Sequence, residues 1–374
     1  MRYYIIAGEA SSDLHGSNLV KELKKIDTIA TIRCWGGDMM QEAGAELVKH
    51  YRNLAFMGFV EVIMNLGTIM KNLRFCKDDI LQFKPDALIL IDYPGFNLRI
   101  AEWAKLHGIR VIYYISPQVW AWKESRVKTI KASVDKMLVI LPFEQEFYRK
   151  RDLKVEYVGH PLVEVIDKEK MKASGINPAS DSPLNEKNII AILPGSRKQE
   201  VEKKLPVMLA ASRNFPDHHF IVAKASSLED SFYDELMSTY PKVRSVRNNT
   251  YALLMQSKAA LVTSGTATLE TALFGVPQVV CYKGNNISYQ IAKRLVTIKY
   301  ISLVNLIMDK QVVTELIQND LTIENLNREL YKLIHDQKVL ELMKQEYDAL
   351  WKLLSEGGHA SAKAARSIVD YIRH

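Results

Sequence analysis

Short, nearly continuous apolar blocks alternate along this chain with longer segments of helical periodicity. A strand reads as a continuous apolar block when helices cover both faces of a parallel sheet. The alternation therefore predicts an α/β fold built from doubly wound, Rossmann-like sheets. The expected strands are Tyr3–Ala7, Ala87–Ile91, Arg110–Ile115, Lys136–Leu141, Val155–Val158, Ile189–Leu193, Phe220–Ala223, Val243–Val246, Ala260–Val262 and Gln278–Tyr282.

A polar segment, residues 168–188, interrupts the alternation and carries Gly175, Pro178 and Pro183. Such residues mark loops and linkers, and a chain of 374 residues suits two domains of about 150–200 residues each. We therefore expect an N-terminal domain over residues 1–167, a linker over 168–188, a C-terminal domain over 189–345 and a helical tail over 346–374 that can cross back to the first domain. Two such domains facing each other enclose a cleft.

Charge and cysteine content exclude several classes of protein. The net charge of +7 permits attraction to phosphates, anionic lipid or nucleic acid but selects none of them. Basic residues are scattered rather than gathered on one helix, which argues against a nucleic-acid partner. Three cysteines that lie far apart exclude a disulfide framework. No apolar run reaches about 18 residues and the first residues carry no export signal, so neither a membrane span nor secretion is expected.

Ligands of such sheets bind outside the carboxyl ends of the strands, so the loops that follow the strands are the informative ones. The first loop, Gly8–Asp13, lacks the spacing of a dinucleotide site. Its carboxylates suit hydrogen bonds from sugar hydroxyls. We favour a site role for Glu9. For Asp13 a site role and capping of the first helix are equally supported, and either Ser12 or Asp13 is expected to be that helix's N-cap.

The next two strand ends carry a carboxylate and two tryptophans. Asp92 follows an apolar strand, where loss of water raises a carboxyl pKa and makes a candidate general base; a turn-forming Asp before Pro94 is the alternative. Asn97 belongs to the same loop. The following loop, Ser116–Trp122, includes Gln118 and Trp120 and is expected to form an aromatic wall that stacks on sugar or packs in the core. His160 ends a further strand, although a lone histidine is more often structural.

Two loops of the second half fit a diphosphate. In Leu193–Arg197 the flexible Gly195 is followed by Ser196 and Arg197, whose guanidinium is a permanent bidentate donor. The other loop is rich in small and hydroxylated residues and opens a helix. Glu270, about one turn inside that helix, either binds ribose hydroxyls or completes a capping box. The residues of this second loop are Ser264, Gly265, Thr266, Ala267 and Thr268.

An apolar stretch over residues 54–70 has too many apolar faces for a solvated helix. A buried core helix is one interpretation, and an exposed surface for lipid chains is the other, with Lys71, Arg74 and Lys77 beside it to meet anionic headgroups. The sequence holds no HExxH, CxxC or DxD motif, so no tight metal site is indicated.

Taken in order, the blocks AGEASSD, LIDYPGFN, YISPQVWAW, LPFEQEFY, VGHPL, LPGSRKQEVE and SGTATLETALFGVPQVVCY resemble the lipid-A-disaccharide synthase family from Tyr4 to about Leu306. The resemblance implies a glycosyltransferase of the GT-B type that uses no cofactor and no tightly held metal. It implies an inverting transfer from UDP-2,3-diacylglucosamine to 2,3-diacylglucosamine 1-phosphate, a β-1,6 linkage and release of UDP. It also implies work at the cytoplasmic face of the inner membrane of Gram-negative bacteria.

Carried over by position, Asp92 and Arg197 match residues that are important in the family, and Glu9 falls in its first-loop motif. Ser12 stands where the family motif has glycine. Whether Asp92 or Glu9 is the general base, which acyl length is preferred and whether the chain forms a homodimer stay open. The resemblance places the apolar stretch at a membrane or acyl contact made by Phe56, Met57, Phe59, Val60, Ile63 and Met64.

Two alternative functions remain at this point. Another GT-B enzyme of UDP-sugars, such as a peptidoglycan-precursor transferase or a 2-epimerase, shares the layout but not the SPQVWAW block. A catalytically silent binding protein for a nucleotide sugar or lipid is the second alternative, and the retention of Asp92 and Arg197 speaks against it.

Overall fold

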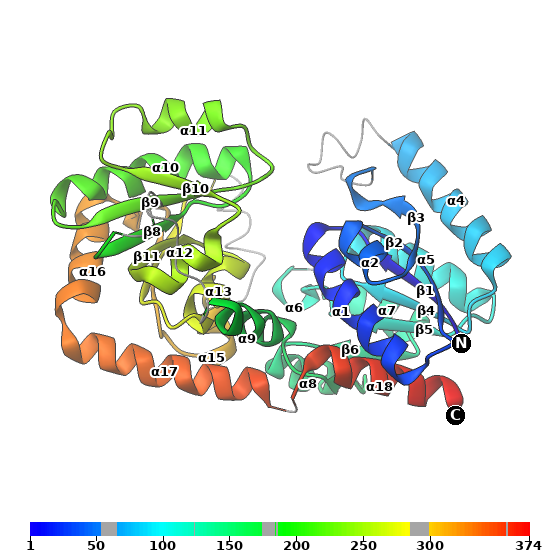
Figure 1. The fold of residues 1–374 in the computed structure, drawn as a ribbon. Helices are drawn as coiled ribbons and strands as arrows, with labels where there is room; N and C mark the ends of the chain where they lie inside the picture. The colour runs from blue at the N-terminus through cyan, green and yellow to red at the C-terminus, as the bar shows by residue number, and fades with distance from the viewer. Residues whose placement is uncertain (54–65, 123, 174–183, 185, 285–298, 357) are drawn as a thin grey trace. The chain divides into compact units, whose positions relative to one another are not determined.

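The computed structural model describes all residues except 54–65, 123, 174–183, 185, 285–298 and 357. The chain divides into two compact units (Figure 1). The first unit is Met1–Pro161 together with Leu354–His374, and the second is Leu162–Leu353. The last helix of the chain therefore belongs to the same unit as the first strand.

A parallel seven-stranded sheet forms the centre of the first unit, in the order β3-β2-β1-β4-β5-β6-β7. Its strands are β1 (Arg2–Ala7), β2 (Thr31–Gly36), β3 (Glu46–His50), β4 (Ala87–Ile91), β5 (Val111–Tyr114), β6 (Lys136–Val139) and β7 (Glu156–Tyr157). Its helices are α1 (Ala10–Ile26), α2 (Asp38–Glu42), α4 (Leu66–Phe83), α5 (Pro94–Leu106), α6 (Val119–Trp122), α7 (Arg126–Ser133), α8 (Pro142–Arg149) and α18 (Ala360–Arg373), with a short 3₁₀ turn at Tyr51–Asn53.

Both faces of this sheet are buried, which explains the continuous apolar strands. In β1, Tyr4 and Ile6 pack with residues of α4 and α5, whereas Tyr3 and Ile5 point to the other face and pack with α1 and α18. Helices α1 and α18 lie side by side although they are far apart in the sequence (Figure 1). Arg110 secures the end of α18 by donating a hydrogen bond of 2.6 Å to the carbonyl of residue 372.

A parallel six-stranded sheet forms the second unit, in the order β10-β9-β8-β11-β12-β13. Its strands are β8 (Ile189–Leu193), β9 (His219–Lys224), β10 (Arg244–Arg247), β11 (Ser257–Thr263), β12 (Gln278–Tyr282) and β13 (Thr314–Ile317). Its helices are α9 (Pro161–Ala173), α10 (Lys198–Ala211), α11 (Asp230–Met237), α12 (Thr250–Gln256), α13 (Thr266–Leu273), α15 (Leu303–Met308), α16 (Ile323–His335) and α17 (Gln337–Ser355), with 3₁₀ turns at Ser212–Asn214 and Gln318–Asp320. The doubly wound α/β prediction is thus confirmed in both halves of the chain.

Three strands escaped the sequence prediction, and two short segments differ from it. Strands β2, β3 and β13 lie at or beside sheet edges, and polar residues such as Arg33, Lys49 and Glu315 interrupt their apolar runs. Residues 119–122 form the helix α6 rather than part of a loop. Residues 168–173, expected to open a linker, are the end of α9, and most of the remaining linker lies outside the described residues.

Each sheet reverses its direction of growth between two central strands. In the first unit this happens between β1 and β4, and in the second between β8 and β11. At such a switch point the two following loops diverge, and the crevice between them is where doubly wound sheets bind ligands. Four of the loops singled out in the sequence flank these two switch points: those after β1, β4, β8 and β11.

Candidate active site

The first switch point brings the loops of Glu9 and Asp92 together. Ala7 at the end of β1 pairs in register with Ile91 at the end of β4. A Cβ atom at Gly8 would lie only 2.4 Å from the ring of Tyr93, so only glycine allows these two loops to touch. Glu9 is exposed and Asp92 is half-buried beside it. The sequence placed both side chains on the right loops, and the strand order makes them neighbours.

The backbone at Asp92 is held in an unusual conformation. Asp92 and Tyr93 have φ angles of 46° and 48°, the left-handed region that non-glycine residues seldom adopt. Two buried side chains fix this turn by donating to the Asp92 carbonyl: Asn97 Nδ2 at 2.8 Å and the Tyr113 hydroxyl at 2.5 Å. Asn97, a predicted substrate contact, is fully buried and supports the turn in this structure.

The pKa of the Asp92 carboxyl group is raised, and burial is the main cause. Loss of water raises the pKa of Asp92 to about 7, and the nearby negative charge of Glu9 raises it further. A carboxyl group with this pKa changes protonation near neutral pH, as a general base requires. The strand-end position predicted this direction of shift.

Asp13 has a different role from the helix cap expected for it. Glu9 occupies the N-cap position of α1, and Asp13 lies in the first turn. The nearly buried carboxylate of Asp13 accepts hydrogen bonds from the N–H groups of Gly37 at 2.7 Å and of Met39 and Met40 at 3.2 Å each. It therefore caps α2 instead of α1, and the predicted cap at Ser12 or Asp13 was wrong. A substrate contact of Asp13 stays a prediction.

A buried glutamate contacts Trp120 of the short helix α6. Trp120 Nε1 donates to Glu144 at 3.3 Å, and its ring meets Phe143 edge to face at 4.9 Å. Gln118, directly before this helix, is exposed. Burial raises the pKa of Glu144 to about 8. Glu144 was not among the predicted site residues, although a carboxylate shortly after the end of β6 is a signal of the same kind as Asp92 after β4.

His160 is a buried, uncharged residue. Its backbone N–H donates to the carbonyl of Leu354 at 3.1 Å, and burial, with a smaller effect of His15, lowers the pKa of its imidazole to about 3. Burial also lowers the pKa of His15 to about 4. Both imidazoles are therefore uncharged at neutral pH, so neither acts there as an imidazolium acid.

The loops after β8 and β11 touch at the second switch point. Gly195 has a φ of 108°, and a Cβ atom there would lie 3.0 Å from Glu200 Oε2 and 3.2 Å from Thr263 Cγ2. Arg197 is the N-cap residue of α10. Its side chain is 70% exposed and lies 3.3 Å from Glu200. An exposed guanidinium at a helix start is suited to an anionic ligand.

Internal hydrogen bonds shape the loop after β11. Gly265 has a φ of 148°, Thr268 donates its hydroxyl to the Gly265 carbonyl at 2.8 Å, and Ser264 donates to the carbonyl of Ile301 at 2.8 Å. Gly265 and Thr266 are exposed, and Ala267 is half-buried. The first N–H groups of a helix have no intrahelical acceptor, so α13 presents backbone donors at this turn. The hydroxyls of Ser264 and Thr268 both donate within the protein, and a substrate contact of either residue stays a prediction.

Glu270 borders a cavity of about 720 Å³ in the second unit. Its carboxylate accepts a hydrogen bond of 3.2 Å from the hydroxyl of Tyr251, and burial raises its pKa. The third residue of α13 is Thr268, so Glu270 is not placed to complete a capping box. Asn249 and Thr250 line the same cavity, which has the size and mixed polarity of a small-molecule site.

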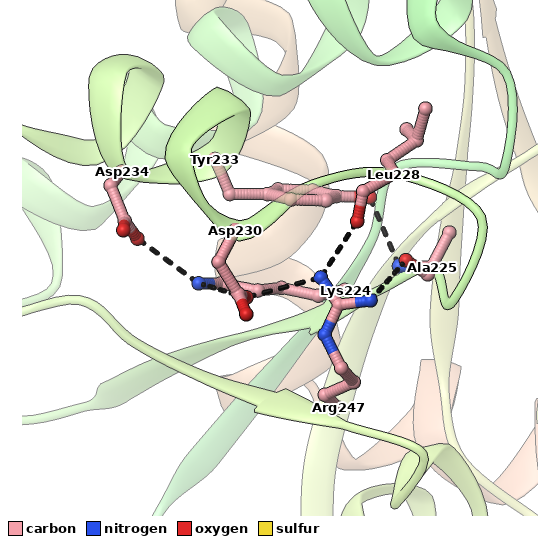
Figure 2. Close-up of polar contacts among 7 residues, drawn as sticks. All are labelled: Lys224, Ala225, Leu228, Asp230, Tyr233, Asp234 and Arg247. Carbon is pink, nitrogen blue, oxygen red and sulfur yellow. Dashed lines mark hydrogen bonds and ion pairs between the residues drawn. The ribbon is translucent and has the colours of Figure 1, made fainter.

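A polar network around Arg247, drawn in Figure 2, is connected to the loop after β8 through Ser227, and residue patterns did not predict it. Arg247 on β10 donates to the carbonyls of Ala225 at 3.1 Å and Leu228 at 2.7 Å, which fixes the loop over residues 225–228. From that loop Ser227 donates to the Ser196 carbonyl at 3.2 Å. Because a trans peptide points its C=O and N–H in opposite directions, this bond directs the N–H of Arg197 away from Ser227.

Ion pairs hold the same network to α11. Lys224 lies 3.0 Å from both Asp230 and Asp234, and Arg247 lies 3.1 Å from Asp230 (Figure 2). The Tyr233 hydroxyl accepts a hydrogen bond of 3.0 Å from the N–H of Ala225. All of these residues are distant in sequence from Ser196, so their contacts could not be predicted from residue patterns.

Comparison with known proteins decides the family. The chain matches the family model described as lipid-A-disaccharide synthetase over residues 3–369. It is 37% identical to the lipid-A-disaccharide synthase of Geobacter sulfurreducens, with 99% of this chain and 97% of that protein covered. It is 34% identical to that of Coxiella burnetii, with 98% of each chain covered.

The chain belongs to the lipid-A-disaccharide synthase family. It is therefore a glycosyltransferase of lipid A biosynthesis, and the function that the motifs predicted is confirmed. Solved structures share its fold. A UDP-GlcNAc 2-epimerase from Neisseria meningitidis bound to UDP-GlcNAc aligns with a TM-score of 0.70 at 13% identity, covering 99% of this chain and 100% of that one. The calicheamicin glycosyltransferase aligns at 0.60 and 18%, covering 100% and 98%. These likenesses show the fold alone, which is the GT-B fold expected.

The described part of the chain shows neither a cluster of metal-ligand side chains nor a membrane-spanning helix. Within it, His, Cys, Asp and Glu side chains do not gather in threes as metal ligands would. No helix in this part of the chain is long and apolar enough to cross a bilayer.

Proposed function

We propose that this synthase transfers a 2,3-diacylglucosamine unit from its UDP derivative to the 6-hydroxyl of 2,3-diacylglucosamine 1-phosphate. The reaction forms a β-1,6 linkage and releases UDP. The observation that supports this proposal is the different chemistry of the two switch points. The first presents the carboxylates of Glu9 and Asp92, and the second presents glycine-containing loops with the exposed Arg197.

The second unit holds UDP in this proposal. The diphosphate lies against the exposed Arg197 and the backbone N–H groups of Ser196 and Gly265, where helix starts add favourable partial charge. The nucleoside occupies the cavity beside Glu270, whose carboxylate accepts hydrogen bonds from ribose hydroxyls. Leu184, Tyr251 and Met255 give that cavity the apolar walls that a nucleobase needs.

Asp92 is the general base in this proposal. The 6-hydroxyl oxygen of the acceptor attacks the anomeric carbon of the donor from the face opposite the diphosphate, and the bond from that carbon to the phosphate oxygen breaks. The hydroxyl proton passes to the Asp92 carboxylate, which a pKa near 7 makes an effective acceptor. Negative charge that develops on the departing UDP is stabilised by Arg197 and the backbone donors of the second unit.

Exchanging Asp92 for asparagine tests the assignment. Asp92→Asn should lower the rate of disaccharide formation by about 10²- to 10⁴-fold, the usual contribution of one positioned base, and leave the affinity for UDP within about twofold. Asp86→Asn is the matched control, because Asp86 lies at the opposite end of the same strand and is exposed. An Asp92→Asn enzyme that retains full turnover would exclude Asp92 from the role.

We also propose a peripheral contact with the cytoplasmic face of the inner membrane. The residues expected to make it, 56–64, lie outside the described residues, but α4 continues the same segment. On α4, Met70 and Phe75 are 61% and 48% exposed beside the exposed Lys71 and Arg74, a combination that suits anionic lipid headgroups.

Vesicle binding tests this contact. Phe75→Ser should weaken sedimentation with anionic vesicles, whereas Leu106→Ser, an equally apolar exposed site on α5, should leave it unchanged. Equal losses in both variants, or none in Phe75→Ser, would contradict the assignment to α4.

A further inference from the structure

A lysine is buried beneath the second switch point. Lys204 on α10 is only 2% exposed, and its Nζ donates a hydrogen bond to the Thr263 hydroxyl and lies 3.6 Å from Glu200. Burial lowers the pKa of its ammonium group, an effect that the charge of Glu200 opposes. Burial of a charge is costly and seldom kept without a purpose, and nothing assigned so far uses this one.

The contacts of Lys204 join the two loops that meet at this point. Thr263 is the last residue of β11 and directly precedes the loop of Ser264–Thr268. Glu200 binds Lys204 through one carboxylate oxygen and approaches Arg197 through the other, at 3.3 Å. Gly195 packs against both Glu200 and Thr263. A chain of contacts therefore runs from Arg197 through Glu200 and Lys204 to the second loop.

The charges of Arg197, Glu200 and Lys204 together determine how an anionic ligand is received at this point. Arg197 is the exposed cation, and Glu200, 35% exposed, is an anion directly behind it. Without a third charge the pair would be neutral and Glu200 would repel a diphosphate. Lys204 restores one net positive charge to the group. It also pairs with Glu200, so that the Arg197 guanidinium can leave Glu200 and bind a ligand.

We propose that Lys204 is a positioning residue for the diphosphate: its buried ammonium group neutralises Glu200 so that Arg197 is available to the ligand, and its bond to Thr263 fixes the start of the second loop. This inference rests on the proposed function, which places a diphosphate at these loops. The role is specific to the phosphates, because the cavity beside Glu270 is lined by none of these four residues.

Binding of UDP and of uridine to the full chain, measured by calorimetry, tests the proposal. Lys204→Met removes the charge and keeps a flexible side chain of similar length. The affinity for UDP should fall by about 10- to 100-fold, the scale of one lost charge-assisted interaction, and the affinity for uridine should change by less than about twofold. Lys203→Met is the matched control: it is the neighbouring residue on α10, it is exposed, and it makes the same charge change. It should leave both affinities unaltered.

A second variant guards against a Lys204→Met protein that does not fold. Thr263→Val keeps the shape of the side chain and removes the acceptor of the lysine. It should lower the UDP affinity by about 3- to 10-fold at unchanged uridine affinity. A parallel fall of both affinities in either folded variant, or no change in UDP affinity, overturns the role of Lys204. Failure of the unaltered protein to bind UDP more tightly than uridine would instead overturn the proposed function.

Discussion

Asp92 combines a left-handed backbone with a carboxyl group whose charged form is disfavoured by burial. Both features cost stability, and strained, desolvated groups that the fold nevertheless maintains are typical of functional sites. Asn97 and Tyr113 hold the turn by its carbonyl and leave the carboxyl group to other partners. The residue is therefore kept by its surroundings in a form that is reactive at neutral pH.

The pH dependence of the reaction should distinguish Asp92 from Glu9 as the base. Because the base acts when deprotonated, kcat/KM should fall below an apparent pKa of about 7 in the unaltered enzyme. The negative charge of Glu9 raises the pKa of Asp92, so Glu9→Gln should move the fall in kcat/KM to lower pH and retain turnover. A Glu9→Gln enzyme that has lost turnover would assign the base to Glu9. Initial rates between pH 5 and 9 with saturating and limiting acceptor measure it.

Asp92→Asn should also stabilise the first unit at high pH. The pKa of Asp92 is higher in the folded chain than in the unfolded one, so its contribution to stability is present at low pH and is lost as pH rises through about 7. Asparagine removes that loss and adopts left-handed φ more readily. The melting temperature at pH 8.5 should rise by about 2–4 °C for each 1 kcal/mol gained. The gain should be smaller at pH 5, which lies between the ordinary aspartate pKa of 3.8 and the folded-state pKa of about 7. A lower melting temperature at both pH values would contradict the burial of the charge.

At the scale of elements, the sequence identified those that are buried on both faces. The bounds of β1, β4 and β8 were predicted to within one residue, because nearly every side chain is apolar there, whereas β11 begins three residues earlier than expected, at the polar Ser257 and Lys258. The strands β2, β3 and β13 were missed, because polar residues interrupt their apolar runs. The loops that flank the switch points were found, since glycine, arginine and carboxylates after a strand are unusual. Contacts between distant segments, such as that of Asp13 with Gly37, follow from the strand order and are invisible in a single sequence.

Capping of α2 by Asp13 has a measurable energy. Asp13→Ala leaves buried N–H groups of Gly37 and Met40 without their acceptor and should lower the free energy of unfolding by about 2–4 kcal/mol in urea. Asp38→Ala is the control, because Asp38 is in the first turn of the same helix but is 63% exposed. It should cost less than about 1 kcal/mol. Similar losses in the two variants would show that Asp13 is not the cap of α2.

Arg247 should influence the loop after β8, to which the proposed function assigns the diphosphate, although it does not touch Ser196 itself. Arg247→Met releases the carbonyls of Ala225 and Leu228, and with them the contact of Ser227 to Ser196. Amide exchange over residues 225–228 should accelerate, and UDP affinity should fall by about 3- to 10-fold. Arg244→Met on the same strand, 51% exposed, is the control and should change neither. Faster exchange with unaltered UDP affinity would show that residues 225–228 do not contribute to ligand binding.

At the scale of the whole molecule, the chain builds two doubly wound units whose switch points carry complementary chemistry. The first gathers carboxylates, a chemistry suited to accepting protons and hydroxyl hydrogen bonds, and the second gathers an arginine and helix starts, a chemistry suited to phosphate. The last helix, α18, packs in the core of the first unit together with β1 and α1. On the proposed function, the second unit alone holds the diphosphate of the donor.

Hydrogen exchange of the full chain with and without UDP tests this placement of the diphosphate. UDP should slow exchange over residues 193–201 and 262–273 and leave residues 7–13 and 90–97 unchanged. Protection confined to the loops of Glu9 and Asp92 would contradict it.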